Sequence, residues 1–180
     1  MKYISILRGI NVSGQKKIVM KDLQVLYQNL GFKNILTYIQ TGNVIFDSNE
    51  KKTLVLKNRI ESAIEGKYKF HVPVEIRTKS EILKIIKNCP FGSINPIENG
   101  TKVLLTFLSS APSKTNISKI QEYVKLPEKL MVVGKEVYLY CPNGYGKSKL
   151  SNNFIENKLG VDATTRNWKS LLKLYELSTQ

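Results

Sequence analysis

The chain has 180 residues and a formal net charge of +14 at pH 7, with 28 basic residues against 14 acidic ones. An apolar fraction of 42% is ordinary for a protein that buries a core, and no apolar run reaches the ~18 residues that a membrane-spanning helix needs. Two cysteines and one histidine exclude a disulfide framework and the usual zinc patterns. We therefore expect a cytoplasmic protein with no cofactor, no bound metal and no membrane partner.

The positive charge is spread over both halves of the sequence rather than held in one tail. Such a charge favours polyanionic partners, either nucleic acid or small phosphorylated ligands. The alternative is a lysine-rich, solvated surface, because net charge governs solubility and non-specific binding rather than fold. The sequence leaves both interpretations open.

The first half predicts alternating strands and helices. Helical spacing from Met20 to Leu30 and from Leu56 to Ile64 predicts two helices, closed by Gly31 and Gly66, and 47–49 offer caps for the second. Short apolar runs predict four strands, at 3–7, 35–40, 43–46 and 72–76. Another helix is expected around residues 82–89. The order strand–helix–strand–strand–helix–strand is the ferredoxin-like pattern, which belongs to the α+β class.

Residues 90–101 resemble a linker, because proline, glycine, serine and asparagine interrupt every period there. We place the internal boundary in this stretch. The predicted division is an N-terminal ferredoxin-like unit at 1–89, a linker at 90–101, and a C-terminal ferredoxin-like unit plus a final helix at 102–180.

The second half repeats the order of the first. The sequence predicts strands at 103–108, 130–133, 137–141 and 161–165, with helices around 117–124, 150–159 and 168–175. Asn167 is a candidate cap for the last helix. The repeat depends on element order, because residue identity between the halves is low. We expect two tandem ferredoxin-like (βαββαβ) units with antiparallel sheets, each followed by an extra helix.

The chain direction through such a unit predicts which polar residues lie close together. In the first half, 8–17 and the hairpin turn 40–43 belong to the same end of the sheet. In the second half, 146–149 belongs to the same end as Arg166 and Asn167. Cations also stand near three predicted helix starts, where a bound anion would offset their unfavourable interaction with the helix dipole.

The segment Gly144-Tyr145-Gly146-Lys147-Ser148 is similar to the end of a nucleotide phosphate-binding loop. The first glycine of that pattern is missing, since Cys141 stands in its place, and no aspartate follows an apolar run as a magnesium ligand. We reject a nucleoside triphosphatase and expect Ser148 to cap a helix.

Four motifs resemble an uncharacterised bacterial family, domain of unknown function 1697. They are Leu7-Arg8-Gly9-Ile10-Asn11-Val12, Tyr38-Ile39-Gln40-Thr41-Gly42-Asn43-Val44, Ser148-Lys149-Leu150 and Thr165-Arg166-Asn167-Trp168. Ser13 and Thr41 depart from the usual glycine and serine of that pattern. The resemblance implies a compact cytosolic α+β protein and no particular activity.

These residues predict a non-catalytic cytosolic protein that binds a phosphate-bearing ligand or a nucleic-acid backbone. Charge would come from Arg8, Lys17, Lys149 and Arg166, and orienting hydrogen bonds from Asn11, Asn43, Ser148 and Asn167. The alternative is an enzyme that acts on a small anionic substrate in a cleft between the two halves. A third interpretation is structural, with the three asparagines acting only as turn and cap residues.

Overall fold

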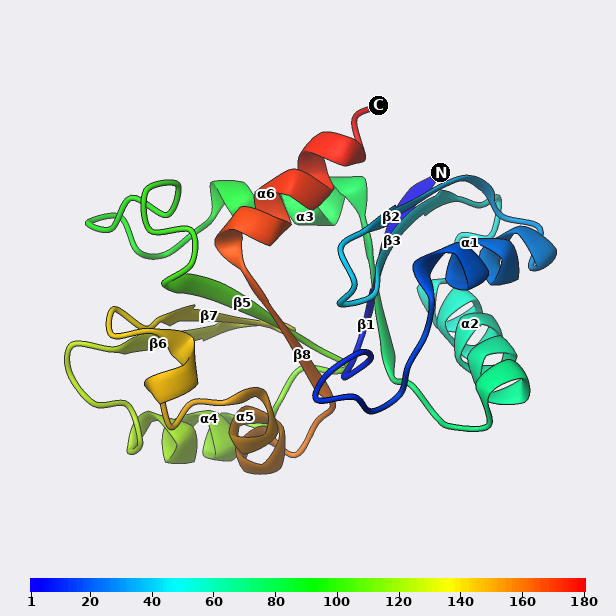
Figure 1. Ribbon diagram of the computed structural model, residues 1–180. Helices are drawn as coiled ribbons and strands as arrows, with labels where there is room; N and C mark the ends of the chain where they lie inside the picture. Colours follow the sequence, from blue (N-terminus) through cyan, green and yellow to red (C-terminus); the bar gives the residue numbers. More distant parts are fainter. The chain divides into compact units, whose positions relative to one another are not determined.

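The computed structural model describes residues 1–180 and contains two four-stranded antiparallel sheets with helices (Figure 1). In the first half the elements are β1 (Lys2–Leu7), α1 (Met20–Asn29), β2 (Lys33–Tyr38), β3 (Asn43–Asp47), α2 (Thr53–Tyr68), β4 (Val74–Thr78) and α3 (Lys79–Lys87). In the second half they are β5 (Val103–Leu108), α4 (Lys114–Gln121), β6 (Lys129–Val133), β7 (Glu136–Tyr140), η1 (Tyr145–Lys147), α5 (Asn152–Leu159), β8 (Ala163–Asn167) and α6 (Trp168–Leu177).

Both sheets have the ferredoxin-like strand order. The order is β2-β3-β1-β4 in the first sheet and β6-β7-β5-β8 in the second, and every pair is antiparallel. The predicted fold class, two tandem βαββαβ units each followed by an extra helix, is therefore confirmed. Strands β1, β3 and β5 are short, mainly apolar runs that are buried along almost their whole length, and the helices carry apolar residues at helical spacing.

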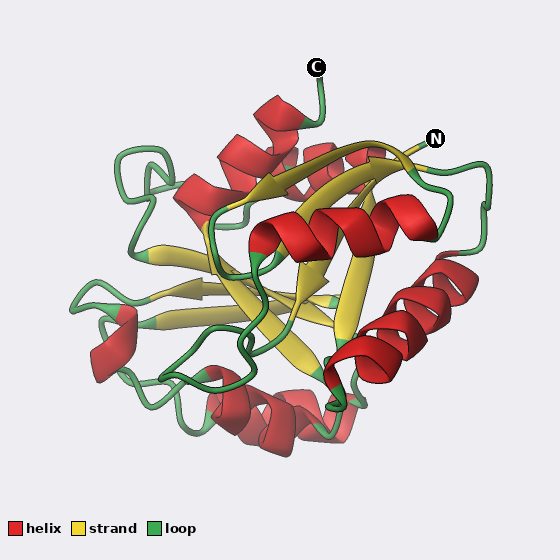
Figure 2. Ribbon diagram, turned by 45° about the vertical axis from the view of Figure 1, so that its right-hand side comes forward, coloured by secondary structure: helices red, strands yellow, loops and turns green.

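Each sheet has helices over one face (Figures 1 and 2). In the first sheet, Tyr3, Val44 and Phe46 pack with apolar residues of α1 and α2 in one buried cluster. In the second sheet, Leu104 and Leu139 pack in the same way with residues of α4 and α5. Side chains alternate between the two faces along a strand, so the register decides which polar residues share a face.

The boundaries of α2 differ from the prediction. The helix begins after Lys52, with no side-chain cap, so 47–49 do not cap it. It also continues through Gly66 to Tyr68, and Lys69 ends it in the left-handed conformation, with φ 63°. A glycine within a helix costs only ~1 kcal/mol, which the packing of the buried face of α2 outweighs.

The chain forms two compact units: Met1–Lys84 with Leu174–Gln180, and Ile85–Lys173. No helix or strand lies between Lys87 and Val103. The predicted domain limits, 1–89 and 102–180 around a linker at 90–101, stay a prediction. No helix of the chain has the length and apolar character needed to cross a membrane.

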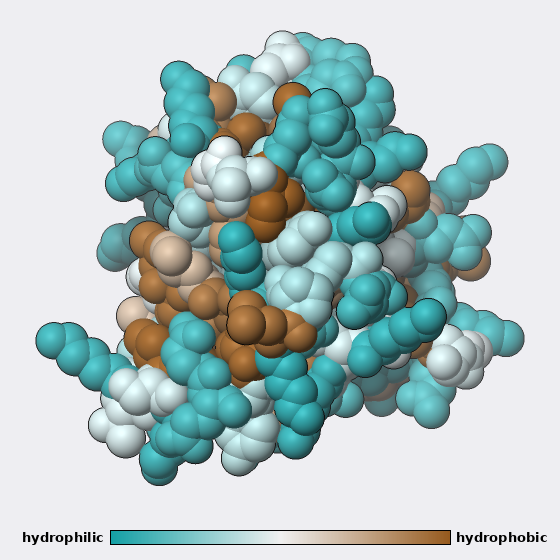
Figure 3. Space-filling model, turned by 90° about the vertical axis from the view of Figure 1, so that its left-hand side faces the viewer, coloured by the Kyte–Doolittle hydropathy of each residue, from teal (hydrophilic) through white to brown (hydrophobic).

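Hydrophilic side chains project over much of the surface, and apolar residues come to the surface between them on the face in Figure 3. Several large apolar side chains are strongly exposed, among them Leu54, Ile97 and Leu126.

Candidate functional site

The loop after β1 and the β2–β3 turn meet at one end of the first sheet, as the sequence predicts. The backbone N–H of Leu7 donates to the carbonyl of Gly42 at 2.8 Å. Gly42 has φ +77°, and a Cβ atom there would lie 2.6 Å from Cδ1 of Ile10. Only glycine fits this close approach, so the turn residue fixes the loop against the sheet.

Asn11 fastens this loop through its side chain. Its Nδ2 donates to the carbonyl oxygens of Ile18 at 2.9 Å and Gln40 at 2.8 Å, and its Oδ1 accepts from the Ile18 N–H at 2.9 Å. Asn11 itself is in the left-handed region, with φ 56°, which asparagine tolerates better than most residues. These bonds give Asn11 the turn role of the structural interpretation.

Two of the other three predicted residues of this half, Asn43 and Arg8, have internal contacts. Asn43 is fully buried, and its Nδ2 donates to the Tyr38 carbonyl at 3.1 Å and to Oγ1 of Thr41 at 3.0 Å. Arg8 is half-buried, and its backbone N–H donates to the Pro73 carbonyl at 2.9 Å. Neither lines the pocket that opens beside this loop.

That pocket, the loop pocket, has a volume of about 540 Å³. Its lining residues are Asn11, Gly14, Lys17, Ile18, Val19, Met20, Lys21 and Gln40. Lys17 and Lys21 are its cations, and both are exposed. The first turn of α1 has no side-chain cap but carries Asp22, whose carboxylate offsets the positive end of the helix dipole.

In the second unit, the predicted residues come to one end of the sheet but divide between its faces. Tyr140 at the end of β7 pairs with Val103 at the start of β5, and Asn167 at the end of β8 pairs with Leu104. Tyr145 contacts the helix-covered face, where its hydroxyl donates to Oγ1 of Thr165 at 3.4 Å. Because strand side chains alternate, Arg166 belongs to the opposite face. Lys149 lies over the rings of Tyr123 and Phe154 on the helix-covered side, so it does not share a face with Arg166.

Ser148 does not cap a helix, contrary to the prediction. The segment Tyr145–Lys147 forms a 3₁₀ turn, and α5 begins later, with Ser151 as its N-cap. Oγ of Ser148 accepts from the Leu150 N–H at 3.0 Å. Burial raises the pKa of Cys141, and the neighbouring Ser148 side chain offsets part of that rise.

Asn167 caps α6, as predicted, because its Oδ1 accepts from the Ser170 N–H at 2.8 Å. The neighbouring Arg166 donates from Nη1 to the Thr165 carbonyl at 2.9 Å. Burial lowers the pKa of Arg166 to about 10, so the guanidinium is still charged at pH 7. The ligand-binding role given to both residues stays a prediction.

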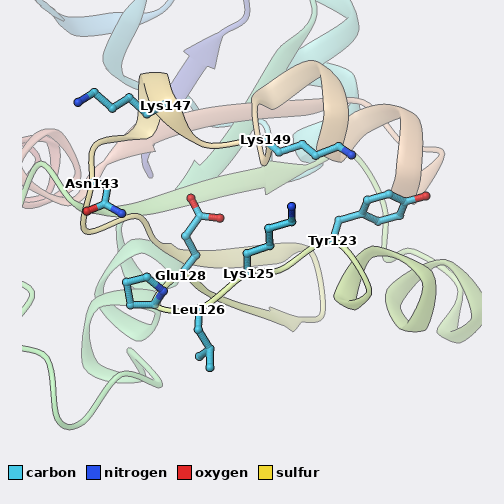
Figure 4. Close-up of a pocket in the computed structure, with 8 residues that line it drawn as sticks. Tyr123, Lys125, Leu126, Glu128, Asn143, Lys147 and Lys149 are labelled. Carbon is cyan, nitrogen blue, oxygen red and sulfur yellow. The ribbon is translucent and has the colours of Figure 1, made fainter.

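A second pocket, the lysine pocket, lies where α4 leads to β6 and β7 leads to α5 (Figure 4). Its volume is about 600 Å³ and its lining residues are Tyr123, Lys125, Leu126, Pro127, Glu128, Asn143, Lys147 and Lys149. The side chains of Lys125 and Glu128 rise towards the segment that carries Lys147 and Lys149, whereas Leu126 points away from it (Figure 4).

Lysines and aromatic rings pack together at one side of this pocket. The Lys149 ammonium lies 4.8 Å from the centre of the Tyr123 ring, and the Lys158 ammonium lies 4.4 Å from it. Tyr123 and Phe154 pack edge to face with 5.1 Å between their centroids. Cation–π contacts of this kind are worth ~0.5–1 kcal/mol at exposed positions, so they favour one position of the Lys149 side chain at the rim.

Sequence reasoning found Lys149 but missed Tyr123, Lys125, Glu128 and Asn143. Lys125 and Glu128 stand in the connection between α4 and β6, which has no motif of its own. The signal was topological: β6 begins beside Tyr140, where β7 ends, so this connection shares an end of the sheet with 141–151. No cluster of three or more histidine, cysteine, aspartate or glutamate side chains suited to a metal ion occurs in the chain.

Comparison with known proteins gives a family and a fold. A family model described as "Protein of unknown function (DUF1697)" matches residues 1–138. The chain resembles the solved structure of a conserved bacterial protein from Streptococcus pneumoniae, with a TM-score of 0.76, 22% sequence identity and 98% of each chain covered. At this identity the likeness shows the fold alone. No curated protein matches the chain.

Proposed function

The chain belongs to the DUF1697 family of proteins of unknown function, and from its own residues we propose a non-catalytic protein that binds a phosphate-bearing ligand or a nucleic-acid backbone at the lysine pocket. The observation that carries this proposal is the group of three lysines, Lys125, Lys147 and Lys149, around one hollow with a single carboxylate.

The charges of these lysines are not compensated inside the protein. Neither the Lys125 nor the Lys147 ammonium makes a hydrogen bond or an ion pair, and Lys149 contacts only the aromatic rings. The Lys147 and Lys149 side chains extend in different directions from their shared segment, and the Lys125 side chain rises towards that segment (Figure 4). An anion in the pocket would gain from any of these uncompensated charges that it contacts, which supports a phosphate group as the ligand.

The pocket also offers contacts for the rest of a ligand. Tyr123 provides an aromatic ring, and Asn143 provides an amide that can donate and accept. The volume lies within the ~300–1,000 Å³ usual for small-molecule sites. Of the residues predicted from sequence, Lys149 is retained in this proposal. The ligand-binding roles of Arg8, Asn11, Lys17, Asn43, Ser148, Arg166 and Asn167 stay predictions.

Titration calorimetry with inorganic phosphate, and fluorescence anisotropy with a labelled single-stranded DNA, test the proposal. The variant is Lys147→Gln with Lys149→Gln, which removes two charges and keeps side chains of similar length. We expect it to bind the preferred ligand about tenfold or more weakly, since hydrogen bonds to charged groups contribute ~1.5–3 kcal/mol.

The matched control is Lys114→Gln with Lys135→Gln. Both lysines are exposed, and both lie towards the other end of the second sheet, where Leu108 donates to the Lys135 carbonyl. This control changes the net charge by the same amount. Equal losses of affinity for inorganic phosphate in the two double variants would contradict a specific site and favour a solvated basic surface.

The alternative function, an enzyme acting on a small anionic substrate, stays a prediction. Catalysis needs a poised base, acid or nucleophile. Turnover of a phosphorylated compound, abolished by a variant of one such group, is the result that would favour it.

A further inference from the structure

Glu128 is the feature of the lysine pocket that phosphate binding alone does not explain. Its side chain is half-buried and rises into the space below Lys147 and Lys149 (Figure 4). Its carboxylate makes no hydrogen bond and no ion pair within the protein. The backbone around it is fixed, because the Glu128 N–H donates to the Lys125 carbonyl at 2.8 Å.

A carboxylate in an anion site weakens the binding of an anion that has no hydrogen-bond donor for it. At neutral pH it only accepts hydrogen bonds, and a like charge nearby repels a phosphate. Its presence favours a ligand that brings hydrogen-bond donors together with its negative charge. Sugar hydroxyl groups are such donors, and hydrogen bonds to a carboxylate are roughly twice as strong as neutral ones.

Two other partners fit the pocket less well. A metal ion needs several ligands, whereas Glu128 is the only acidic residue that lines the pocket. A DNA backbone has phosphodiesters and sugars without free internal hydroxyl groups, so it would meet the repulsion of Glu128 and give no donor in return.

We propose that the lysine pocket binds a phosphate monoester of a sugar with free hydroxyl groups, with Lys125 and Lys149 on the phosphate and Glu128 on the hydroxyl groups. This inference rests on the proposed function, since it names the class of ligand for the same site. The shared chemistry covers a free sugar phosphate and a nucleoside monophosphate.

The test compares two anions on the wild-type protein and on Glu128→Gln by titration calorimetry at pH 8. Sulfate carries charge but no donor. Ribose 5-phosphate carries hydroxyl donors, and its phosphate is fully deprotonated because the second pKa of a phosphate monoester is about 6. Glutamine keeps the shape of the side chain and removes its charge. Glu98→Gln, at an exposed position outside the pocket, is the control for net charge.

The expected result is a change of opposite sign for the two ligands. Glu128→Gln should bind ribose 5-phosphate about tenfold more weakly, since a charge-assisted hydrogen bond is lost. It should bind sulfate a few times more tightly, because a repelling charge is removed. Tighter binding of both ligands would overturn the inference and leave the proposed function standing. If the wild-type protein binds neither ligand, the proposed function fails.

A separate titration with adenosine 5′-monophosphate distinguishes a free sugar phosphate from a nucleoside monophosphate as the ligand. A nucleoside monophosphate would bind more tightly than ribose 5-phosphate, and Tyr123→Leu would remove that difference, because base stacking on an aromatic ring is worth ~1–3 kcal/mol. Equal affinities would assign the site to free sugar phosphates. Tighter binding of single-stranded DNA than of either compound would contradict the class we propose.

Discussion

Asn11 connects three parts of the first unit through one side chain: its own loop, the entry to α1 and the β2–β3 turn. Replacing it with alanine removes three hydrogen bonds and leaves a residue with a Cβ in the left-handed region, where φ is 56°. We expect Asn11→Ala to lower the free energy of unfolding by about 2–4 kcal/mol, measured by urea denaturation.

Asn11→Gly separates the two contributions, because glycine adopts the left-handed region without strain. It should lose only the hydrogen bonds, and so be more stable than the alanine variant by about 1 kcal/mol. An alanine variant of unchanged stability that no longer binds phosphate would instead support the ligand-binding role predicted for Asn11.

Alanine variants at Gly42 and Gly9 distinguish the cost of backbone strain from the cost of overpacking. Both have positive φ, +77° and +66°, but a Cβ at Gly42 would meet Ile10 and Leu7 whereas a Cβ at Gly9 would meet nothing within 4 Å. Gly9→Ala should cost about 1 kcal/mol for its left-handed backbone. Gly42→Ala should cost about 1–3 kcal/mol more, because it overpacks the loop against β1. Equal thermal stability of the two variants would contradict this reading of the turn.

At the scale of elements, the fourth strand of each unit ends in the same way. Thr78 ends β4, and its Oγ1 accepts from the Glu81 N–H at 3.2 Å. Asn167 ends β8, and its Oδ1 accepts from the Ser170 N–H at 2.8 Å. Arg77 and Arg166 stand one residue earlier, and each donates from Nη1 to the preceding carbonyl. The two units therefore resemble each other in the helix caps that follow their fourth strands as well as in the order of their elements.

The cap gives a prediction for α6. Asn167→Ala should lower the free energy of unfolding by about 1 kcal/mol, the usual value of an N-cap, whereas Asn167→Asp should keep the cap and most of the stability. Calorimetric unfolding measures both. The structural interpretation also predicts unchanged affinity for phosphate, so a loss of affinity at unchanged stability would contradict it.

The order of strands and helices followed from the sequence because hydrophobic period is a local property. The residues at which helices begin and end were predicted less accurately from the sequence. Ser148, Ser151 and Asn152 are all plausible cap residues, and the 3₁₀ turn at Tyr145–Lys147 moved the start of α5 beyond the first of them. The face of Arg166 depends on strand register, which is a tertiary property. For the same reason the lysine pocket was only partly predictable, since Lys125 and Glu128 come from a different connection.

At the scale of the whole molecule, the net charge of +14 should produce non-specific binding to nucleic acid. Neutralising phosphates releases counterions, so such binding weakens steeply with salt. We expect anisotropy with random single-stranded DNA to show affinity that falls by at least tenfold between ~50 and ~200 mM salt. The Lys147→Gln, Lys149→Gln variant should lose no more affinity than its Lys114→Gln, Lys135→Gln control. A larger loss would mean that nucleic acid enters the lysine pocket.

The most direct test of the central claim is to locate bound phosphate by backbone-amide NMR shifts during a titration with ribose 5-phosphate. The account predicts that the largest shifts occur at 123–128 and 143–149, and that they saturate with one dissociation constant. Largest shifts at 11–21, around the loop pocket, would move the site to the first unit. Small, unsaturated shifts at lysines over the whole surface would contradict a specific site altogether.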